Sequence, residues 1–390
     1  MTRPTLRELF WAFLRIGLTS FGMSILQNLK AMTLRRGFVT ESEIQEGLAL
    51  VQLYPGPIMV DLVAFIGYRS RGVRGALVAA LGFLLPATAM MMAAAVAYVL
   101  YGSLPWVGTM LLGLNALVVG VVLNVTLDFA RNNIRGAVEA VLALMAFALG
   151  LMHINLVWGI LGGLLVGGVI WHKHESVQPE GRQLSVRWAN LGVPLLLGVG
   201  LVALATWSAF HLSPISQLAL VFMKIGAVAF GNGVTILPFM EQDVVGVHHW
   251  LTPSQFSAAV GLGQITPGPI LNSATFVGYL VAGPLGALAS TFAIFAPSIV
   301  MTLVFTELFG HIRHLGPVRG AIRGVMAVFV GMLAGVVLTL GRGSLVLPMS
   351  FVFAAGALVG LRYFRWDTLI VFCGGLALWG GLAYFGWVRI

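Results

Sequence analysis

The sequence predicts an all-α polytopic membrane protein, and three observations indicate this fold class. Of the 390 residues, 59% are hydrophobic and only 9% are charged, whereas a soluble domain usually carries about 25% charged residues. The apolar runs are continuous rather than alternating, which argues against a β-barrel. The tripeptide Pro-Gly-Pro interrupts two of these runs, at Pro55-Gly56-Pro57 and Pro267-Gly268-Pro269. We therefore expect helices that cross a lipid bilayer, two of which are broken.

Charge and motif content exclude several function classes. A net charge of +9 would suggest nucleic acid for a soluble protein, but here basic residues lie mainly in short loops, where they orient the chain in the membrane. Cys373 is the only cysteine, which excludes an intrachain disulfide and a cysteine metal cluster. The chain lacks the Gly-x-x-x-x-Gly-Lys-Ser/Thr motif of nucleotide-driven pumps. We expect no enzyme activity, no cofactor and no metal site.

The first repeat is predicted over residues 1–171. Its first span is Leu9–Leu29, interrupted only by Arg15. Thr40-Glu41-Ser42-Glu43 is typical of a capping box that starts the next helix. That helix is expected to run through Gln52 to the first Pro-Gly-Pro and to restart over Ile58–Tyr68. Four further spans are expected over residues 75–101, 104–127, 134–151 and 153–171.

The rest of the chain is predicted to hold a polar linker (172–190), a connecting span (191–211) and a second repeat (212–390). The second repeat copies motifs of the first in order. Gln52 and the first Pro-Gly-Pro recur as Gln264 and the second, 212 residues later. At an offset of 209 or 211 residues, the chain also repeats Phe13, Ile16, Gly17, Phe21, Gly22, Gly67, Tyr68 and Pro86 as Phe222, Ile225, Gly226, Phe230, Gly231, Gly278, Tyr279 and Pro297. This ordered set indicates an internal duplication.

Six spans per repeat and the connecting span give about 13 transmembrane segments. Because this number is odd, the two repeats would be inverted, related by a pseudo-two-fold axis in the membrane plane, with a broken helix of each near the midplane. A cytoplasmic N-terminus places most basic loop residues inside, as expected. The Lys30–Arg36 cluster is the exception, and it leaves open that the elements near the breaks are re-entrant hairpins.

The two breaks predict a binding site for a small oxyanion. Broken helices survive in lipid only where protein or a wet cavity satisfies the freed backbone groups, and matched breaks mark a transported substrate's site. The helices that restart at Ile58 and Ile270 present free amide groups, which favour anions. Further donors are expected from Gln52, Gln264, Tyr54, Thr266, Asn272 and Ser273. The alternative is that Pro-Gly-Pro only kinks a packed helix.

Three charged residues add to this prediction. Arg15 and Lys224 each lie two residues before a repeated glycine, and a cation at mid-membrane costs about 2.5–3.5 kcal/mol. We expect both to serve an anionic substrate, unless they snorkel to an interface or pair with an acid such as Asp61 or Glu139. Asp61 is a candidate for proton coupling, because its protonation would remove repulsion of the anion. Its alternative role is as a structural partner of Arg15.

These motifs resemble a known family. Gly263-Gln264-Ile265-Thr266-Pro267-Gly268-Pro269, Ala274-Thr275-Phe276-Val277-Gly278-Tyr279 and Phe295-Ala296-Pro297-Ser298 closely resemble the signature of the chromate ion transporter family. Phe222-Met223-Lys224-Ile225-Gly226 and Phe230-Gly231-Asn232-Gly233 look like the start of its second half. The first half is similar through Phe21-Gly22, Pro55-Gly56-Pro57 and Ile66-Gly67-Tyr68-Arg69. It departs from the family at Met23, Ser24 and Gln27, where the family often has Gly, Pro and a following His.

The resemblance implies a secondary transporter that exports chromate across the bacterial inner (plasma) membrane. We expect it to work by alternating access driven by an ion or proton gradient. Sulfate, another tetrahedral dianion, is the expected competitor. A passive anion channel and, from another class, a membrane-embedded redox enzyme are the alternatives. Gly163-x-x-x-Gly167, Gly331-x-x-x-Gly335 and Gly356-x-x-x-Gly360 allow close helix packing, including in a homodimer.

Overall fold

The protein is an all-α membrane protein whose helices form two compact units. The computed structural model describes residues 4–20, 24–152, 154–171, 188–211, 213–231, 233–312 and 316–387. Unit 1 comprises Met1–Ala93, Val177–Ile236 and Thr266–Leu315, and unit 2 comprises Ala94–Ser176, Leu237–Ile265 and Gly316–Ile390. Each unit therefore takes segments from both predicted repeats, and both Pro-Gly-Pro breaks belong to unit 1.

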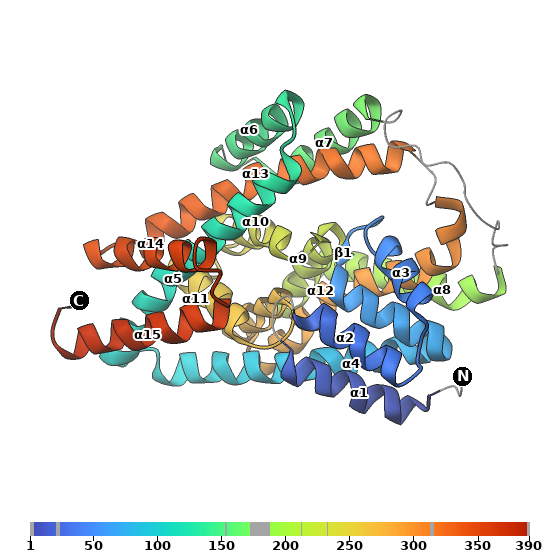
Figure 1. The fold of residues 1–390 in the computed structure, drawn as a ribbon, viewed down its shortest axis with the longest axis horizontal. Helices are drawn as coiled ribbons and strands as arrows, with labels where there is room; N and C mark the ends of the chain where they lie inside the picture. Colours follow the sequence, from blue (N-terminus) through green and yellow to red (C-terminus); the bar gives the residue numbers. More distant parts are fainter. Residues whose placement is uncertain are drawn as a thin grey trace. The chain divides into compact units, whose positions relative to one another are not determined.

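Unit 1 holds both breaks and the helices that follow them, together with α3 before the first break (Figure 1). Its elements are α1 (Leu6–Thr19), α2 (Ser24–Arg35), α3 (Glu41–Leu50), β1 (Gly56–Pro57), the first part of α4 (Ile58–Tyr101), α8 (Trp188–Phe210), α9 (Pro214–Val228), β2 (Phe230–Gly231), η1 (Val234–Ile236), η3 (Ile270–Asn272) and α12 (Ser273–Ile312). Helices α9 and α12 pack closely because Gly226 has no side chain, and a Cβ atom there would collide with the carbonyl of Ile294. Gly17 of α1 meets the carbonyl of Phe83 in α4 in the same way.

Unit 2 is a helix bundle around α13. It contains the end of α4 and the elements α5 (Pro105–Asn133), α6 (Ala137–Leu151), α7 (Val157–Ile170), α10 (Leu237–Met240), η2 (Glu241–Val247), α11 (Pro253–Ile265), α13 (Gly316–Ser344), α14 (Pro348–Arg362) and α15 (Thr368–Tyr384). Helices α6 and α7 lie along α13 (Figure 1). Gly163 and Gly167 meet the backbone of α13 at Gly324 and Gly320, so this Gly-x-x-x-Gly motif serves packing within the chain.

Ten of the described helices are apolar enough to lie in a membrane, but only some are long enough to cross it. Five qualify as spans by length and composition, and five shorter apolar helices have 10–17 residues. The long ones are Ile58–Tyr101, Pro105–Asn133, Leu191–Phe210, Ile270–Leu308 and Gly320–Ser344. The helices expected at 75–101, 104–127, 134–151, 153–171 and 191–211 are thereby confirmed as helical. Most of the predicted linker, residues 172–187, lies outside the described residues.

The prediction of one span over Leu9–Leu29 is wrong, because this segment forms two helices. Helix α1 ends at Thr19, whose hydroxyl donates to the carbonyl oxygen of Arg15 at 2.8 Å. Ser20 has extended backbone angles, and its hydroxyl accepts a hydrogen bond from Asn28 of α2 at 3.0 Å. With 14 and 12 residues, each helix falls short of the roughly 20 residues that a span requires.

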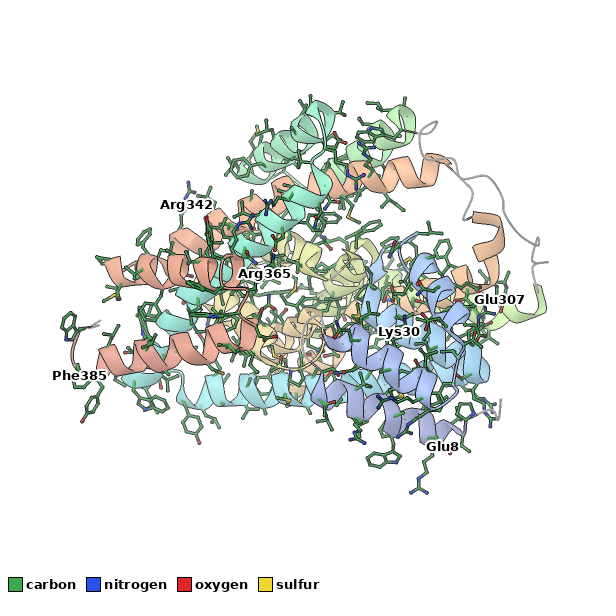
Figure 2. All side chains as sticks on the ribbon, viewed as in Figure 1. Glu8, Lys30, Glu307, Arg342, Arg365 and Phe385 are labelled. Atoms are coloured by element: carbon green, nitrogen blue, oxygen red, sulfur yellow. The ribbon has the colours of Figure 1, made fainter. Side chains whose placement is uncertain are left out.

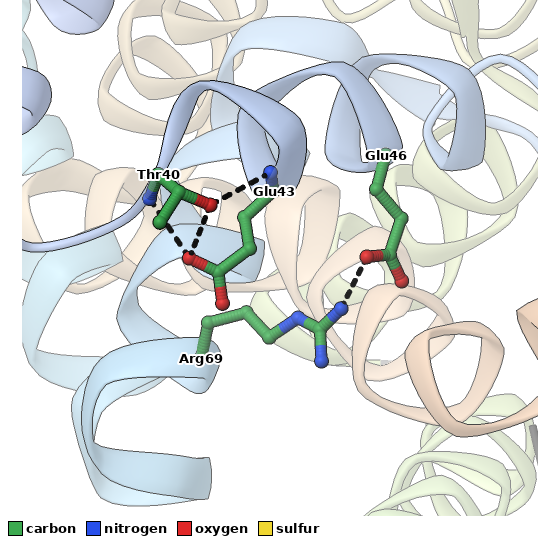
Figure 3. A network of polar contacts seen from close by, with 4 residues as sticks. All are labelled: Thr40, Glu43, Glu46 and Arg69. Atoms are coloured by element: carbon green, nitrogen blue, oxygen red, sulfur yellow. Dashed lines mark hydrogen bonds and ion pairs between the residues drawn. The ribbon is translucent and has the colours of Figure 1, made fainter.

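The capping box predicted at the start of α3 is confirmed. Thr40 and Glu43 hold each other's backbone amides at 2.8 and 3.2 Å, and Glu46 of the same helix pairs with Arg69 of α4 (Figure 3). Thr252 and Gln255, at the start of α11, make the same reciprocal bonds at 2.9 and 3.2 Å. Acidic and basic residues such as Glu8 in the first turn of α1 and Arg342 in the last turn of α13 lie near helix ends (Figure 2).

The long helices α4 and α12 are kinked at matched positions. In α4 the backbone leaves helical geometry at Arg71 (φ −144°, ψ 25°) and Gly72 (φ 63°, ψ −154°). In α12 it does so at Ala282 (φ −141°, ψ 26°) and Gly283 (φ 63°, ψ −154°). The two kinks lie 211 residues apart, so the motifs repeated in the sequence are accompanied by a repeated backbone conformation.

Substituting Gly72 or Gly283, the glycines at the two kinks, is expected to lower stability through backbone strain alone. Nothing lies within 4 Å of a Cβ atom built on Gly72 or Gly283, but their φ/ψ combination is essentially accessible only to glycine, and other residues there cost about 1–3 kcal/mol. We expect Gly72→Ala and Gly283→Ala to lower the thermal unfolding temperature in detergent by similar amounts. Gly108→Ala in α5, which has open space and no positive φ, is the matched control; an equal loss in this variant would contradict the prediction.

Candidate substrate site at the two Pro-Gly-Pro breaks

The first break is an extended segment held by backbone pairing. Helix α3 ends at Leu50, two residues before Gln52, and α4 begins at Ile58 as predicted. Between them, Gly56 and Pro57 form β1, which pairs in parallel with Phe230 and Gly231 of β2. The backbone groups freed by the break thus find partners in the protein, as a membrane interior requires.

The second break has a different backbone. Helix α11 ends at Ile265, and a short 3-10 helix restarts at Ile270, as predicted, before α12 begins at Ser273. Gly268 has a φ of +106°, a conformation that favours glycine because it has no Cβ. Both halves share the Pro-Gly-Pro motif. Among the described residues, however, only the first break forms a strand, and that strand pairs with β2.

Each break packs against the long helix of the other half, at equivalent positions. A Cβ atom on Gly56 would lie 3.1 Å from Cβ of Ser298 in α12, and one on Gly268 would lie 2.8 Å from Cβ of Ala87 in α4. Gly268 follows Gly56 by 212 residues, and Ser298 follows Ala87 by 211. Such reciprocal contacts are typical of a two-fold relation between two elements. Neither break tolerates a side chain at its glycine without a shift of its neighbours.

Asp61 lies directly beneath the first break. It is fully buried (0% exposed), and a Cβ atom on Gly56 would overlap its Oδ2. The nearest hydroxyl groups are those of Ser298 and Thr302, one turn apart on α12, but neither carboxylate oxygen makes a hydrogen bond of normal geometry within the described residues. The Tyr54 hydroxyl lies 2.7 Å from Oγ1 of Thr302, and its ring stacks on Phe305.

Asn272 lies beneath the second break. It is 1% exposed, and its Nδ2 is 3.5 Å from the point where a Cβ atom on Gly268 would lie. Oδ1 accepts a long hydrogen bond of 3.4 Å from Thr88 of α4. No acceptor for Nδ2 exists among the residues that the structure describes. Ser273, the repeat mate of Asp61, is also fully buried, and its hydroxyl donates to the carbonyl oxygen of Ile270 at 2.6 Å.

The other predicted site residues are less closely grouped. Arg15 and Gln52 are exposed, whereas Lys224, Gln264 and Thr266 are half-buried. Gln264 lies in the last turn of α11 and belongs to unit 2. Among the break residues, Gly56, Pro57, Pro267 and Ile270 are buried, and Pro55, Ile58, Gly268 and Pro269 are half-buried. Arg15 and Asp61 do not form an ion pair with each other, and Glu139 pairs with Arg323.

Three site residues were missed from the sequence: Ser298, Thr302 and Thr88. Each donates its hydroxyl hydrogen to a carbonyl three or four residues earlier in its own helix, as hydroxyl residues in apolar helices commonly do. The i, i+4 spacing of Ser298 and Thr302 places them on one helix face. That spacing was a usable signal, but only the structure shows that this face meets the break of the other half.

Broken helices beside buried polar groups, in a chain of long apolar helices, define the class of multi-pass membrane transport proteins. The chain belongs to the chromate transporter family: the family model "Chromate transporter" matches residues 7–168 and 216–380. The two matched regions fall in the two predicted repeats and leave out the whole of the predicted linker and connecting span. The family is one of transporters rather than enzymes, which agrees with the sequence-based prediction.

Individual relatives agree with this assignment. The chain is 29% identical to the chromate transport protein of Cupriavidus metallidurans over 97% of this chain and 94% of the relative. It is 31% identical to a probable chromate transport protein of Synechococcus elongatus, covering 87% and 86% of the two chains. An uncharacterized transporter of Methanocaldococcus jannaschii is 29% identical over 85% and 84%. No solved structure matches the chain.

Proposed function

We propose that the protein is a secondary transporter that exports chromate across the bacterial inner membrane by alternating access. The observation that carries this proposal is the pair of Pro-Gly-Pro breaks, which pack reciprocally on the long helices of the two halves in a chain of the chromate transporter family. We propose chromate as the substrate because two relatives are named chromate transport proteins. Sulfate, which has the same tetrahedral shape and charge, is the expected competitor.

The architecture that we propose consists of two inverted repeats, 1–171 and 212–390, joined by the linker 172–190 and the connecting helix 191–211. Two matched features support the duplication: the kinks at Gly72 and Gly283 and the capping boxes at Thr40 and Thr252. About 13 segments would then enter the membrane, of which the half-length ones near the breaks, such as α3 and α11, fit the discontinuous helices of transporters. A homodimer would use Gly356, which faces open space.

Coupling to the proton gradient is the energy source that we propose, with Asp61 as the proton-carrying residue. A buried carboxylate in a membrane protein is costly and commonly belongs to a proton pathway. Asp61 is fully buried beside the first break. Its protonation would remove the repulsion between a carboxylate and an incoming dianion, which links proton binding to substrate binding.

The test is uptake of labelled chromate into inverted vesicles or proteoliposomes under an imposed pH gradient. We expect accumulation against the chromate gradient and competition by sulfate. A passive channel would dissipate the gradient but never accumulate chromate, and a redox enzyme would yield reduced chromium instead. Either result would contradict the proposal.

Lys224→Gln is expected to slow chromate transport by about tenfold, because removal of a half-buried cation weakens attraction of a dianion in a low-dielectric site. Arg15, at the equivalent position on α1, is exposed, so Arg15→Gln is expected to have a smaller effect. Initial rates of uptake at saturating and limiting chromate measure both. Arg7→Gln, in the same helix as Arg15 and also exposed, is the control. Unchanged rates in the Lys224 and Arg15 variants would remove both cations from the site.

A further inference from the structure

The two matched breaks have opposite hydrogen-bonding chemistry. Beside Gly56, the nearest polar atom is a carboxylate oxygen of Asp61, which can only accept hydrogen bonds when it is ionised. Beside Gly268, it is the amide nitrogen of Asn272, which can only donate. Both side chains are almost fully buried, and neither of these atoms has a hydrogen-bond partner among the described residues. Buried polar atoms without partners are rare and call for a ligand or a proton.

Three hydroxyl groups lie at the first break, and each has a hydrogen-bond partner other than Asp61. Ser298 donates its hydrogen to the carbonyl oxygen of Phe295 at 3.1 Å, and Thr302 donates its hydrogen to that of Ser298 at 2.9 Å. The Tyr54 hydroxyl then serves as the donor in its 2.7 Å bond with Thr302. Ser298 and Thr302 can donate to an ionised Asp61 only by giving up these carbonyl partners. A buried carboxylate without a full set of donors is costly.

Charged residues on the surrounding elements do not alter this pattern. The other elements that pack on β1 and α12 are α3, α8, α9, β2 and η3. Glu46 of α3 pairs with Arg69, and Glu307 of α12 accepts a hydrogen bond from Tyr68 at 2.7 Å. The remaining charged or titratable side chains on the described part of these elements are Glu41, Glu43, Lys224 and Tyr279. A proton bound to Asp61 removes this cost, because the neutral carboxyl group carries no charge and can donate to a hydroxyl oxygen.

The second pocket is suited to an oxyanion. The amide nitrogen of Asn272 faces Gly268, and its Oδ1 lies 3.4 Å from the Thr88 hydroxyl, which also donates to the carbonyl oxygen of Leu84 at 3.0 Å. Asn272 directly precedes α12, a helix of 40 residues, whose first amide groups and dipole favour negative charge at this end. A buried donor and a helix start thus point to the same place.

We propose that the two breaks bind different ligands: the first holds a proton on Asp61, and the second binds the oxyanion through Asn272. This division deepens the proposed function and rests on it for the identity of the anion. It replaces the symmetric anion cage expected from the sequence with one anion site and one proton site. The duplicated motif supplies the same backbone break twice, and the side chains at positions 61 and 272 give each break its own task.

The experiment uses two nearly isosteric substitutions in opposite directions, Asp61→Asn and Asn272→Asp, in full-length protein reconstituted into liposomes. Chromate exchange without a gradient reports anion binding, and accumulation driven by a pH gradient reports coupling. We expect Asp61→Asn to lose accumulation driven by a pH gradient and to change the KM for exchange less than Asn272→Asp does. Asn272→Asp should raise the KM for exchange by about tenfold or more, because a donor to the anion is replaced by an acceptor. Thr88→Val, which frees the amide group, should raise it less.

An independent readout does not require transport. The infrared spectrum of the wild-type protein at neutral pH should contain a carbonyl stretch of a protonated carboxyl group that is absent in Asp61→Asn. Absence of this band from the wild type, or accumulation driven by a sodium gradient but not by a pH gradient, would overturn the proton assignment. An equal rise in KM for both variants would overturn the division of tasks. If the wild type exchanges neither chromate nor sulfate, the proposed function fails, and the infrared band still decides the state of Asp61.

Discussion

Gly56→Ala is expected to reduce chromate transport by about 100-fold, the loss typical of displacing a functional group by about 1 Å. The methyl group would overlap Oδ2 of Asp61 and come within 3.1 Å of Cβ of Ser298. Asp61 is fully buried, so it cannot move aside into solvent, and the break itself is fixed by its pairing with β2. The added volume must therefore displace the carboxyl group or separate α12 from the break. Initial rates of chromate uptake in proteoliposomes measure the loss.

Two further variants distinguish steric displacement from general damage. Gly200→Ala in α8 adds the same methyl group where nothing lies within 4 Å, and it should transport normally. The double variant Gly56→Ala/Asp61→Ser removes the overlap by placing at position 61 the residue that its repeat mate, Ser273, already has. We expect it to regain the thermal stability of the wild type without regaining proton-driven accumulation. Normal transport by the single Gly56→Ala variant would show that the break is not part of the transport site.

The sequence was sufficient to locate the breaks because their chemistry is local. Proline lacks a backbone donor and glycine lacks a Cβ, so helices had to end before Pro-Gly-Pro and restart after it. The structure confirms the restarts at Ile58 and Ile270 and the capping box at Thr40. Each of these features depends on residues within four positions of one another, which is the range over which sequence patterns determine backbone conformation.

The partners of the breaks were not predictable in the same way. Tyr54 and Thr302 are 248 positions apart, and nothing in an apolar helix indicates which of its hydroxyl residues meets a distant loop. The same limit explains the first span: an apolar run of some 20 residues does not reveal that it leaves helical geometry at Ser20. It also explains the cations, since Arg15 and Lys224 match in sequence but differ in exposure. Tertiary packing decides all three.

Arg323→Gln is expected to lower the stability of unit 2 by about 2–3 kcal/mol, less than the loss of one partner from a fully buried ion pair, because the Arg323 side chain is 26% exposed. Arg323 of α13 donates two hydrogen bonds to Oε1 of Glu139 in α6, and its guanidinium lies 4.4 Å from the centroid of the Trp171 ring. The Glu139 side chain is only 2% exposed. Without Arg323, its carboxylate would stay buried and lose these bonds, and the contact with Trp171 would be lost as well. Thermal unfolding in detergent should show the loss as a large drop in the transition temperature.

A double-mutant cycle tests whether the cost comes from the uncompensated charge. Glu139→Gln/Arg323→Gln removes both charges and should recover most of the stability that Arg323→Gln loses, because no buried carboxylate remains. Arg362→Gln is the matched control, because it breaks the ion pair between Arg362 of α14 and Asp128 of α5. The Asp128 side chain is 58% exposed, and exposed pairs contribute about 0–1 kcal/mol. If the double variant is as unstable as the sum of the two single variants, the two charges are not coupled. The stability of unit 2 would then depend on the packing of the Arg323 side chain against Trp171 rather than on the ion pair.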